Sequence, residues 1–291
     1  MSAGTAIALF LAFASTTLTN LAYLREHDAA AALPRLSMRR PLEAARLLLG
    51  NRAWMVGFAM ESAGFVLYAA ALALASLALV QSIGAGGIGI LAFVSSRMSG
   101  RRLAGRELGG VVLSVLGLAA LGVSLAGGSG EGRGGSVAGI LIWLGASAAA
   151  ALLVLGLPRR LVRPAVANGI AGGVFFSIGD VATKVATGGG ARVAFVVGLI
   201  LGYTLGTARL QLGYQAGGAL TVAGLATLLT NALPIAAGTV VLHEPIPSGA
   251  LGVLRIAAFG ALTAAAFLLA HPERAATSRP GRTAATPTPA A

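Results

Sequence analysis

The sequence predicts an all-α, polytopic membrane helical bundle of about nine transmembrane helices, and three observations support this fold class. Hydrophobic residues make up 56% of the 291 residues and charged residues only 10%, whereas about a quarter of the residues in a soluble protein are charged. The apolar residues fall into long runs, each close to the ~20 residues with which a helix crosses ~30 Å of hydrocarbon. Nearly all cations lie between these runs. The predicted spans are residues 2–24, 53–74, 77–96, 107–126, 137–157, 164–187, 193–213, 217–242 and 248–270.

The cations occupy alternate gaps between the predicted spans. Arginines cluster after spans one, three, five and nine, whereas the opposite gaps hold only Arg133 and Arg192. Because cytoplasmic loops carry the excess of Lys and Arg, we expect an external N-terminus and a cytoplasmic C-terminus in the plasma (inner) membrane. Attraction to anionic lipid headgroups accounts for the net charge of +12 without nucleic acid. The Arg-, Ala- and Gly-rich composition is typical of a GC-rich bacterial genome.

The cytoplasmic gap of residues 25–52 contains an amphipathic segment. Pro41 suits the first turn of a helix. The apolar face of this helix would consist of Leu42, Ala45, Leu48 and Leu49. A helix lying on the membrane surface and a simple basic linker are the two interpretations.

The glycine-rich residues 127–135 divide the chain into four spans, one span and four spans. If the first four and the last four spans are equivalent units, the lone fifth span gives them opposite orientations, as in transporters built from inverted repeats. The predicted domains are a first transmembrane repeat (1–126, with the basic loop 25–52), an external linker plus connecting helix (127–163), a second repeat (164–270) and a disordered cytoplasmic tail (271–291).

Two glycine patterns lie within predicted spans. Gly84–Gly89 has the letters of the G-x-G-x-x-G dinucleotide fingerprint, but that fingerprint requires a preceding strand in a βαβ unit. Within a span it predicts close helix packing and no bound cofactor. Gly198, Gly202 and Gly206 recur every four residues, which favours internal packing against span six or eight. A homodimer seam or a sliding surface is the alternative for this stripe.

Span eight contains Pro234, and Asn231 lies three residues earlier near the same face. Proline removes a hydrogen bond from the helix ladder. A broken helix that binds substrate and an ordinary kink are the two interpretations.

Charged residues inside spans are candidate functional residues, because a charge in hydrocarbon costs at least ~2.5–3.5 kcal/mol. Candidates for substrate binding or for proton or cation coupling are Glu61, Asp180, Asn231 and Gln81, with Lys184, Arg209 and Arg255 as charge partners. Structural pairing is the alternative, of Asp180 with Lys184 or Arg255. The corresponding partner of Glu61 would be Arg209.

The sequence contains no recognisable catalytic or metal-binding constellation. Cysteine is absent, so thiolate metal sites and disulfides are excluded. His27, His243 and His271 are assigned to loops and have no metal-ligand spacing. We therefore expect no enzyme and no cofactor. A non-transporting scaffold or partner subunit, and a membrane enzyme acting on lipid, are the alternatives to transport.

Residues in both halves resemble a known group of transporters. They are Trp54–Gly57, Gly64-Phe65, Tyr68-Ala69-Ala70 and Leu79-Val80-Gln81, followed by Lys184, Asn231 to Pro234, Glu244-Pro245 and Gly252. Across residues 1–270 the chain resembles the drug/metabolite transporter (DMT) superfamily, most of all its EamA-like and magnesium-transporter-like (NIPA-like) branch. The resemblance implies a secondary transporter of a small solute (a metabolite, a drug-like compound or a cation) that works by alternating access.

The arginine asymmetry generates a topology prediction. Reporter fusions at residues 130 and 280 should give opposite signals, external at 130 and cytoplasmic at 280, because positively charged loops stay inside. Identical signals at the two positions would reject the odd number of spans.

Overall fold

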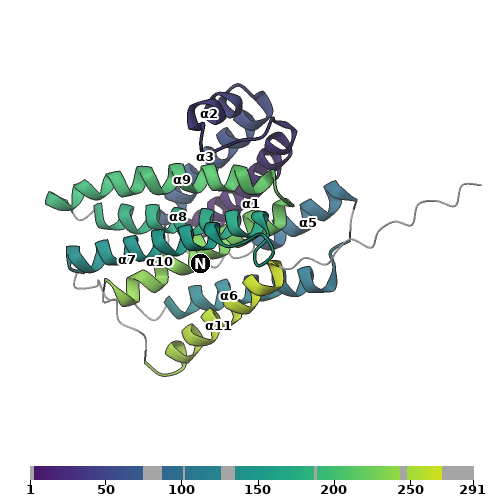
Figure 1. The fold of residues 1–291 in the computed structure, drawn as a ribbon. Coiled ribbons are helices and arrows are strands. Elements are labelled where there is room, and N and C mark those ends of the chain that lie inside the picture. Colours follow the sequence, from purple (N-terminus) through teal and green to yellow (C-terminus); the bar gives the residue numbers. More distant parts are fainter. Residues whose placement is uncertain are drawn as a thin grey trace, which may run out of the picture.

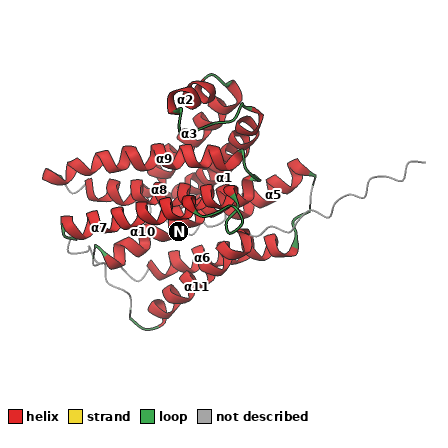
Figure 2. Cartoon of the chain, viewed as in Figure 1, coloured by secondary structure: helices red, strands yellow, loops and turns green. Residues whose placement is uncertain are grey.

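The computed structural model describes residues 3–74, 87–100, 102–125, 135–186, 189–242 and 248–270. These residues form helices and connecting turns, with no strand among them (Figure 2). The helices are α1 (Ala3–Ala32), α2 (Pro41–Leu49), α3 (Arg52–Leu74), α5 (Gly87–Ser99), α6 (Gly105–Leu125), α7 (Val137–Gly156), α8 (Pro164–Ala186), the short 3₁₀ helix η1 (Gly190–Phe195), α9 (Val196–Tyr214), α10 (Ala219–Val240) and α11 (Ala250–Ala270).

A helical membrane bundle is confirmed, while its nine spans stay a prediction. Within the described residues, seven helices are long and apolar enough to cross a membrane: α1, α6, α7, α8, η1 with α9, α10 and α11. The second and third predicted spans correspond to α3, which is not among the seven, and to α5, whose apolar part is shorter. Residues 75–86, between these two helices, lie outside the described residues. The chain is therefore a multi-pass membrane protein by the length and composition of its helices.

Helix α1 is longer than predicted. We expected it to end at Leu24, but it continues to Ala32 and covers 30 residues, or about 45 Å at 1.5 Å per residue. The charged residues 25–28 do not stop it, because the alanines that follow favour helix. Pro34 disfavours the helical conformation at the residue before it. The assignment of His27 to a loop was therefore wrong, while His243 and His271 lie outside the described residues.

The segment after α1 folds back as the helix α2. Its helical prediction is confirmed, with Pro41 in the first turn. Ala44, Leu47 and Leu48 contact the cluster around Trp54. Leu42 is 85% exposed, and whether the exposed apolar residues lie on a membrane stays a prediction. Figure 1 shows α2 beside α3 at one end of the bundle.

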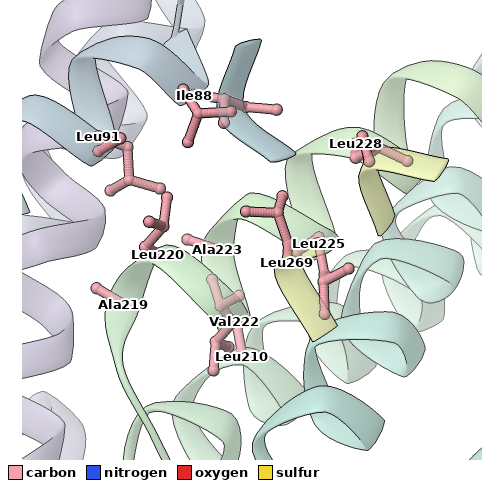
Figure 3. Packing of buried hydrophobic residues seen from close by; sticks show 14 of the residues in the cluster. Ile88, Leu91, Leu210, Ala219, Leu220, Val222, Ala223, Leu225, Leu228 and Leu269 are labelled. Atoms are coloured by element: carbon pink, nitrogen blue, oxygen red, sulfur yellow. The ribbon is translucent and has the colours of Figure 1, made fainter. Parts of the chain in front are cut away.

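Helices α8 and α10 form the centre of the bundle. Of the residues in the α8 span, 83% are buried, against 11% in the α7 span, which places α7 at the periphery. The main core cluster gathers along α10 (Figure 3), where Leu220 and Ala223 lie near Leu91 of α5, and Leu225 lies near Leu269 of α11. Helix α10 continues through Pro234, so the broken-helix interpretation of span eight was wrong.

The glycine patterns let helices approach one another closely. A Cβ atom on Gly202 would lie 2.5 Å from the backbone nitrogen of Gly179 on α8, and one on Gly206 would meet the ring of Phe176. The stripe on α9 therefore packs internally against α8, the helix of predicted span six. Within the G-x-G-x-x-G segment, Gly87 and Gly89 lie in α5, and Gly87 packs against Asn20 of α1. Gly84 to Gly86 lie outside the described residues.

The α8–α9 contact predicts a large difference between two Gly→Ala substitutions. Gly202→Ala should lower the free energy of unfolding by about 1–3 kcal/mol, because the new methyl group meets backbone atoms that cannot move aside easily. Gly145→Ala on α7 is the matched control, because nothing lies within 4 Å of that position. Thermal unfolding of the two purified variants in detergent measures the difference, and equal midpoints would contradict the packing.

Candidate functional site

A buried glutamate on α1 stands at the centre of the site. The side chain of Glu26 is 0% exposed, as is that of Gln211 on α9. The Gln211 side-chain Nε2 donates a hydrogen bond of 2.6 Å to Oε2 of Glu26. On α3, Gly57 makes room for Glu26, since a Cβ atom at position 57 would lie 2.7 Å from Glu26 Cγ. Three helices therefore meet at this carboxyl group.

Glu61 brings a second carboxyl group to the same place. It lies on α3 one turn after Gly57, is partly buried, and its carboxyl group interacts directly with that of Glu26. Helices α1 and α3 form one of the closest pairs in the bundle, and Ser15 Oγ donates a hydrogen bond of 2.7 Å to the carbonyl oxygen of Gly64 further along it. When two carboxyl groups share a desolvated site, one of them keeps its proton unless a cation binds between them.

Two oxygen atoms at this site lack a hydrogen-bond partner within the described part of the chain. They are Oε1 of Glu26 and Oε1 of Gln211. A buried acceptor left unpaired costs about 1–3 kcal/mol, so both oxygens are available to accept from a water molecule, a protonated carboxyl group or a cation. The described residues contain no group of three His, Cys, Asp or Glu side chains that could hold a metal ion.

Asp180 lies on α8 and takes its hydrogen bond from a tyrosine of α9. The Tyr203 hydroxyl donates to Oδ1 of Asp180 at 2.5 Å. Tyr68 of α3 and Tyr23 of α1 are within electrostatic range of Asp180. Tyr23 is also within range of the Glu26–Glu61 pair. Tyr23 therefore lies near both acidic sites.

Polar contacts also clamp the end of α1 to the end of α9. The side-chain Nε2 of Gln215 donates to the carbonyl oxygens of Ala30 and Leu33, at 2.8 and 3.2 Å, and to that of Pro34 at 3.1 Å. Its Oε1 accepts a hydrogen bond of 2.9 Å from the amide of Leu36. The ring of His27 packs edge-on against that of Tyr214, with centroids 5.5 Å apart. We call these contacts the α1–α9 clamp.

The structure describes both partners of two expected charge pairs, Asp180 with Arg255 and Glu61 with Arg209. Arg255 is buried and donates to Ser124 of α6, through Nε to Oγ and through a terminal nitrogen to the carbonyl oxygen, both at 3.3 Å. It lies on α11, whereas Asp180 lies on α8 and accepts its hydrogen bond from Tyr203, and the Asp180–Arg255 pairing stays a prediction. No ion pair within the described residues joins Glu61 to Arg209, because Glu61 faces Glu26 instead. The side chain of Lys184 lies outside the described residues.

Two candidates remain, Asn231 and Gln81. The Asn231 amide donates to the carbonyl oxygen of Thr227 at 2.7 Å, one turn back in its own helix. Gln81 lies outside the described residues. Of the predicted acids, Glu61 lies beside a second acid, Glu26. Asp180 lies beside Tyr203.

Sequence reasoning missed Glu26, Gln211 and Tyr203. Glu26 was assigned to a loop because α1 was ended two residues before it. A usable signal was present: Ser15, Thr19, Ala22 and Glu26 recur at helical spacing and continue one small or polar face. That face is the one covered by Gly57 and Gly64.

No protein-family model, no curated protein sequence and no solved structure matches this chain.

The Glu26–Gln211 contact generates a stability prediction. Gln211→Leu should lower the free energy of unfolding by about 1–3 kcal/mol, because the buried carboxyl group loses its donor. The double variant Glu26→Leu/Gln211→Leu should recover much of this loss, because both polar partners are then gone. Thermal unfolding in detergent measures both variants. Independent, additive losses would show that the two side chains do not interact.

Proposed function

We propose that the protein is a secondary transporter of a small solute that works by alternating access, with proton or cation coupling at the Glu26–Glu61 pair. The observation that carries the proposal is the pair itself: two carboxyl groups, one of them fully buried, lie inside a bundle of membrane helices. Ionisable groups at such depth are costly and mark ion or substrate pathways. Glu61 lies nine residues after the start of α3, or about 14 Å at 1.5 Å per residue.

The helix contacts support two inverted units. Helix α1 packs chiefly on α3, and α8 chiefly on α9, which are the corresponding pairs if residues 1–126 and 164–270 are equivalent. The pairs α5–α6 and α10–α11 also correspond, and so do α1–α5 and α8–α10. Helices α6 and α11, the last of each unit, pack against each other as they would beside a two-fold axis. The peripheral helix α7 would then be the connection that inverts the second unit.

The α1–α9 clamp supports alternating access between these units. It joins the first unit to the second through polar contacts, centred on Gln215, at the end of the bundle where α1 and α9 both finish. Hydrogen bonds that water can replace break at low net cost, so such a contact can open and close. The Glu26–Gln211 bond lies next to it, so a change in the proton or cation at Glu26 would act directly on the contact between the units.

The substrate classes are a metabolite, a drug-like compound or a cation. Two carboxylates with retained water would suit Mg²⁺, and one shared proton would suit proton coupling. A scaffold has no need of buried, unpaired acids, and a lipid-acting enzyme would need a nucleophile with a base beside it. The first alternative predicts no solute flux and the second predicts chemical turnover of lipid.

Transport assays on variants test the proposal. Wild-type protein in proteoliposomes, with and without a pH gradient or a Mg²⁺ gradient, should move one member of a solute panel. Glu26→Gln and Glu61→Gln should fold and bind that solute but lose gradient-driven flux by about tenfold or more, because the amide carries no exchangeable charge. Glu43→Gln is the control, since Glu43 is an exposed carboxylate paired with Arg40 outside the bundle.

The variant Asp180→Asn distinguishes a role of Asp180 in proton or cation coupling from a purely structural role. If Asp180 handles protons or cations, the variant stays folded and binds solute without coupled flux. If Asp180 only anchors Tyr203, the variant loses thermal stability and expression instead. Normal gradient-driven flux in a folded Glu26→Gln/Glu61→Gln variant would remove the pair from the mechanism.

A further inference from the structure

A cavity lies away from the carboxyl site, on the side of α8 that faces α10 and α11. Its volume is about 820 Å³, within the range of about 300–1,000 Å³ that small-molecule sites occupy. Helices α8, α10 and α11 form its walls. Wall residues include Ile170 of α8, Leu229 and Ala236 of α10, and Phe259, Thr263 and Ala266 of α11. Apart from the hydroxyl group of Thr263, these wall side chains are apolar.

The cavity is cationic at one end. Arg159, Arg160 and Arg163 line this end together with Leu161 and Val162, and no acidic side chain is among the lining residues that the structure describes. The arginines sit on the short connection between α7 and α8, which Pro158 organises as a turn. Its carbonyl oxygen accepts hydrogen bonds from the amides of Leu161 (2.8 Å) and Val162 (3.2 Å). This turn holds three positive charges at the mouth of an apolar groove.

The depth of the groove follows from the residues along its walls. Val166 and Ile170 belong to the first two turns of α8, whereas Ala236 lies on the second half of α10. The groove therefore runs from the arginine end of the bundle past the middle of α10. Phe267 and Thr263 on its rim are exposed, so the groove opens sideways onto the surface that a membrane would cover.

We propose that this groove binds one anionic phospholipid, with its phosphate on Arg159, Arg160 and Arg163 and an acyl chain along α8, α10 and α11. The charge matches the head of the lipid, since arginine recognises phosphate through paired N–H donors. The apolar walls match the acyl chain, which makes close van der Waals contacts along them. A basic pocket between membrane helices that meets the leaflet is the expected form of such a site. The site is distinct from the Glu26–Glu61 pair and does not depend on transport.

Native mass spectrometry of the purified full-length protein tests the site. The protein is equilibrated with equal amounts of phosphatidylglycerol and phosphatidylcholine. The wild type should retain one molecule of phosphatidylglycerol in preference to phosphatidylcholine. The triple variant Arg159→Gln/Arg160→Gln/Arg163→Gln should lower this preference by about tenfold. The control triple variant Arg46→Gln/Arg52→Gln/Arg106→Gln loses the same charge from exposed positions outside the groove and should keep the preference.

A second pair of variants tests the acyl-chain part of the groove without changing charge. Ala266→Trp places a ring inside the groove and should lower lipid retention, whereas Ala264→Trp lies on the exposed, non-lining side of the same helix and should not. Equal retention of phosphatidylglycerol in all variants would overturn the proposal. An equal loss in both arginine triples would do so as well, since it would show attraction to net charge alone. Lipid retention is measured on the protein itself, so its outcome is independent of whether any solute is transported.

Discussion

The cost of placing a carboxyl group in hydrocarbon is the constraint on which the rest of this structure depends. Glu26 is fully enclosed, and the groups that surround it do not include a cation among the residues described. Its environment is instead a glutamine donor, a second carboxyl group and nearby tyrosines. Such a set accepts the neutral acid readily and the charged acid only with a partner. The free energy that a charged acid would cost is then available to bind a proton or a cation, which links the packing of the bundle to its proposed chemistry.

Close helix contacts put these acids together. Gly57 and Gly64 let α3 lie directly on α1, which brings Glu61 to Glu26. In the other half, Gly179 and Gly202 bring α8 and α9 into backbone contact, which lets Tyr203 reach Asp180. In a membrane, helices gain little from apolar burial against lipid, so close van der Waals contact between small residues supplies much of the association. The glycines that position the site are therefore also those that hold each helix pair together.

The sequence was sufficient for the class of fold and for part of the site. Run length predicted membrane helices, and the four-residue spacing of Gly198, Gly202 and Gly206 predicted a packed face, because both depend on local periodicity. Pairing depends on which residues from distant helices reach the same depth, and periodicity does not determine that. Ending α1 at the first charges hid Glu26, although the helix continues until Pro34 disfavours it. Glu61 was then assigned a cation as partner when its neighbour is another acid.

Helix α8 contributes residues both to the acidic site at Asp180 and to the arginine-capped groove. Gly172 and Gly179 on one face of α8 contact α9, while Gly169 and Gly173 on another face contact α10. Asp180 follows Gly179 on the α9 side, whereas Ile170 lies on the α10 side and lines the arginine-capped groove. A well-packed interface shifts between discrete arrangements instead of deforming continuously. A movement of α8 against α9 at Asp180 would consequently alter the groove against α10, so an occupied groove would bias the alternating access proposed above.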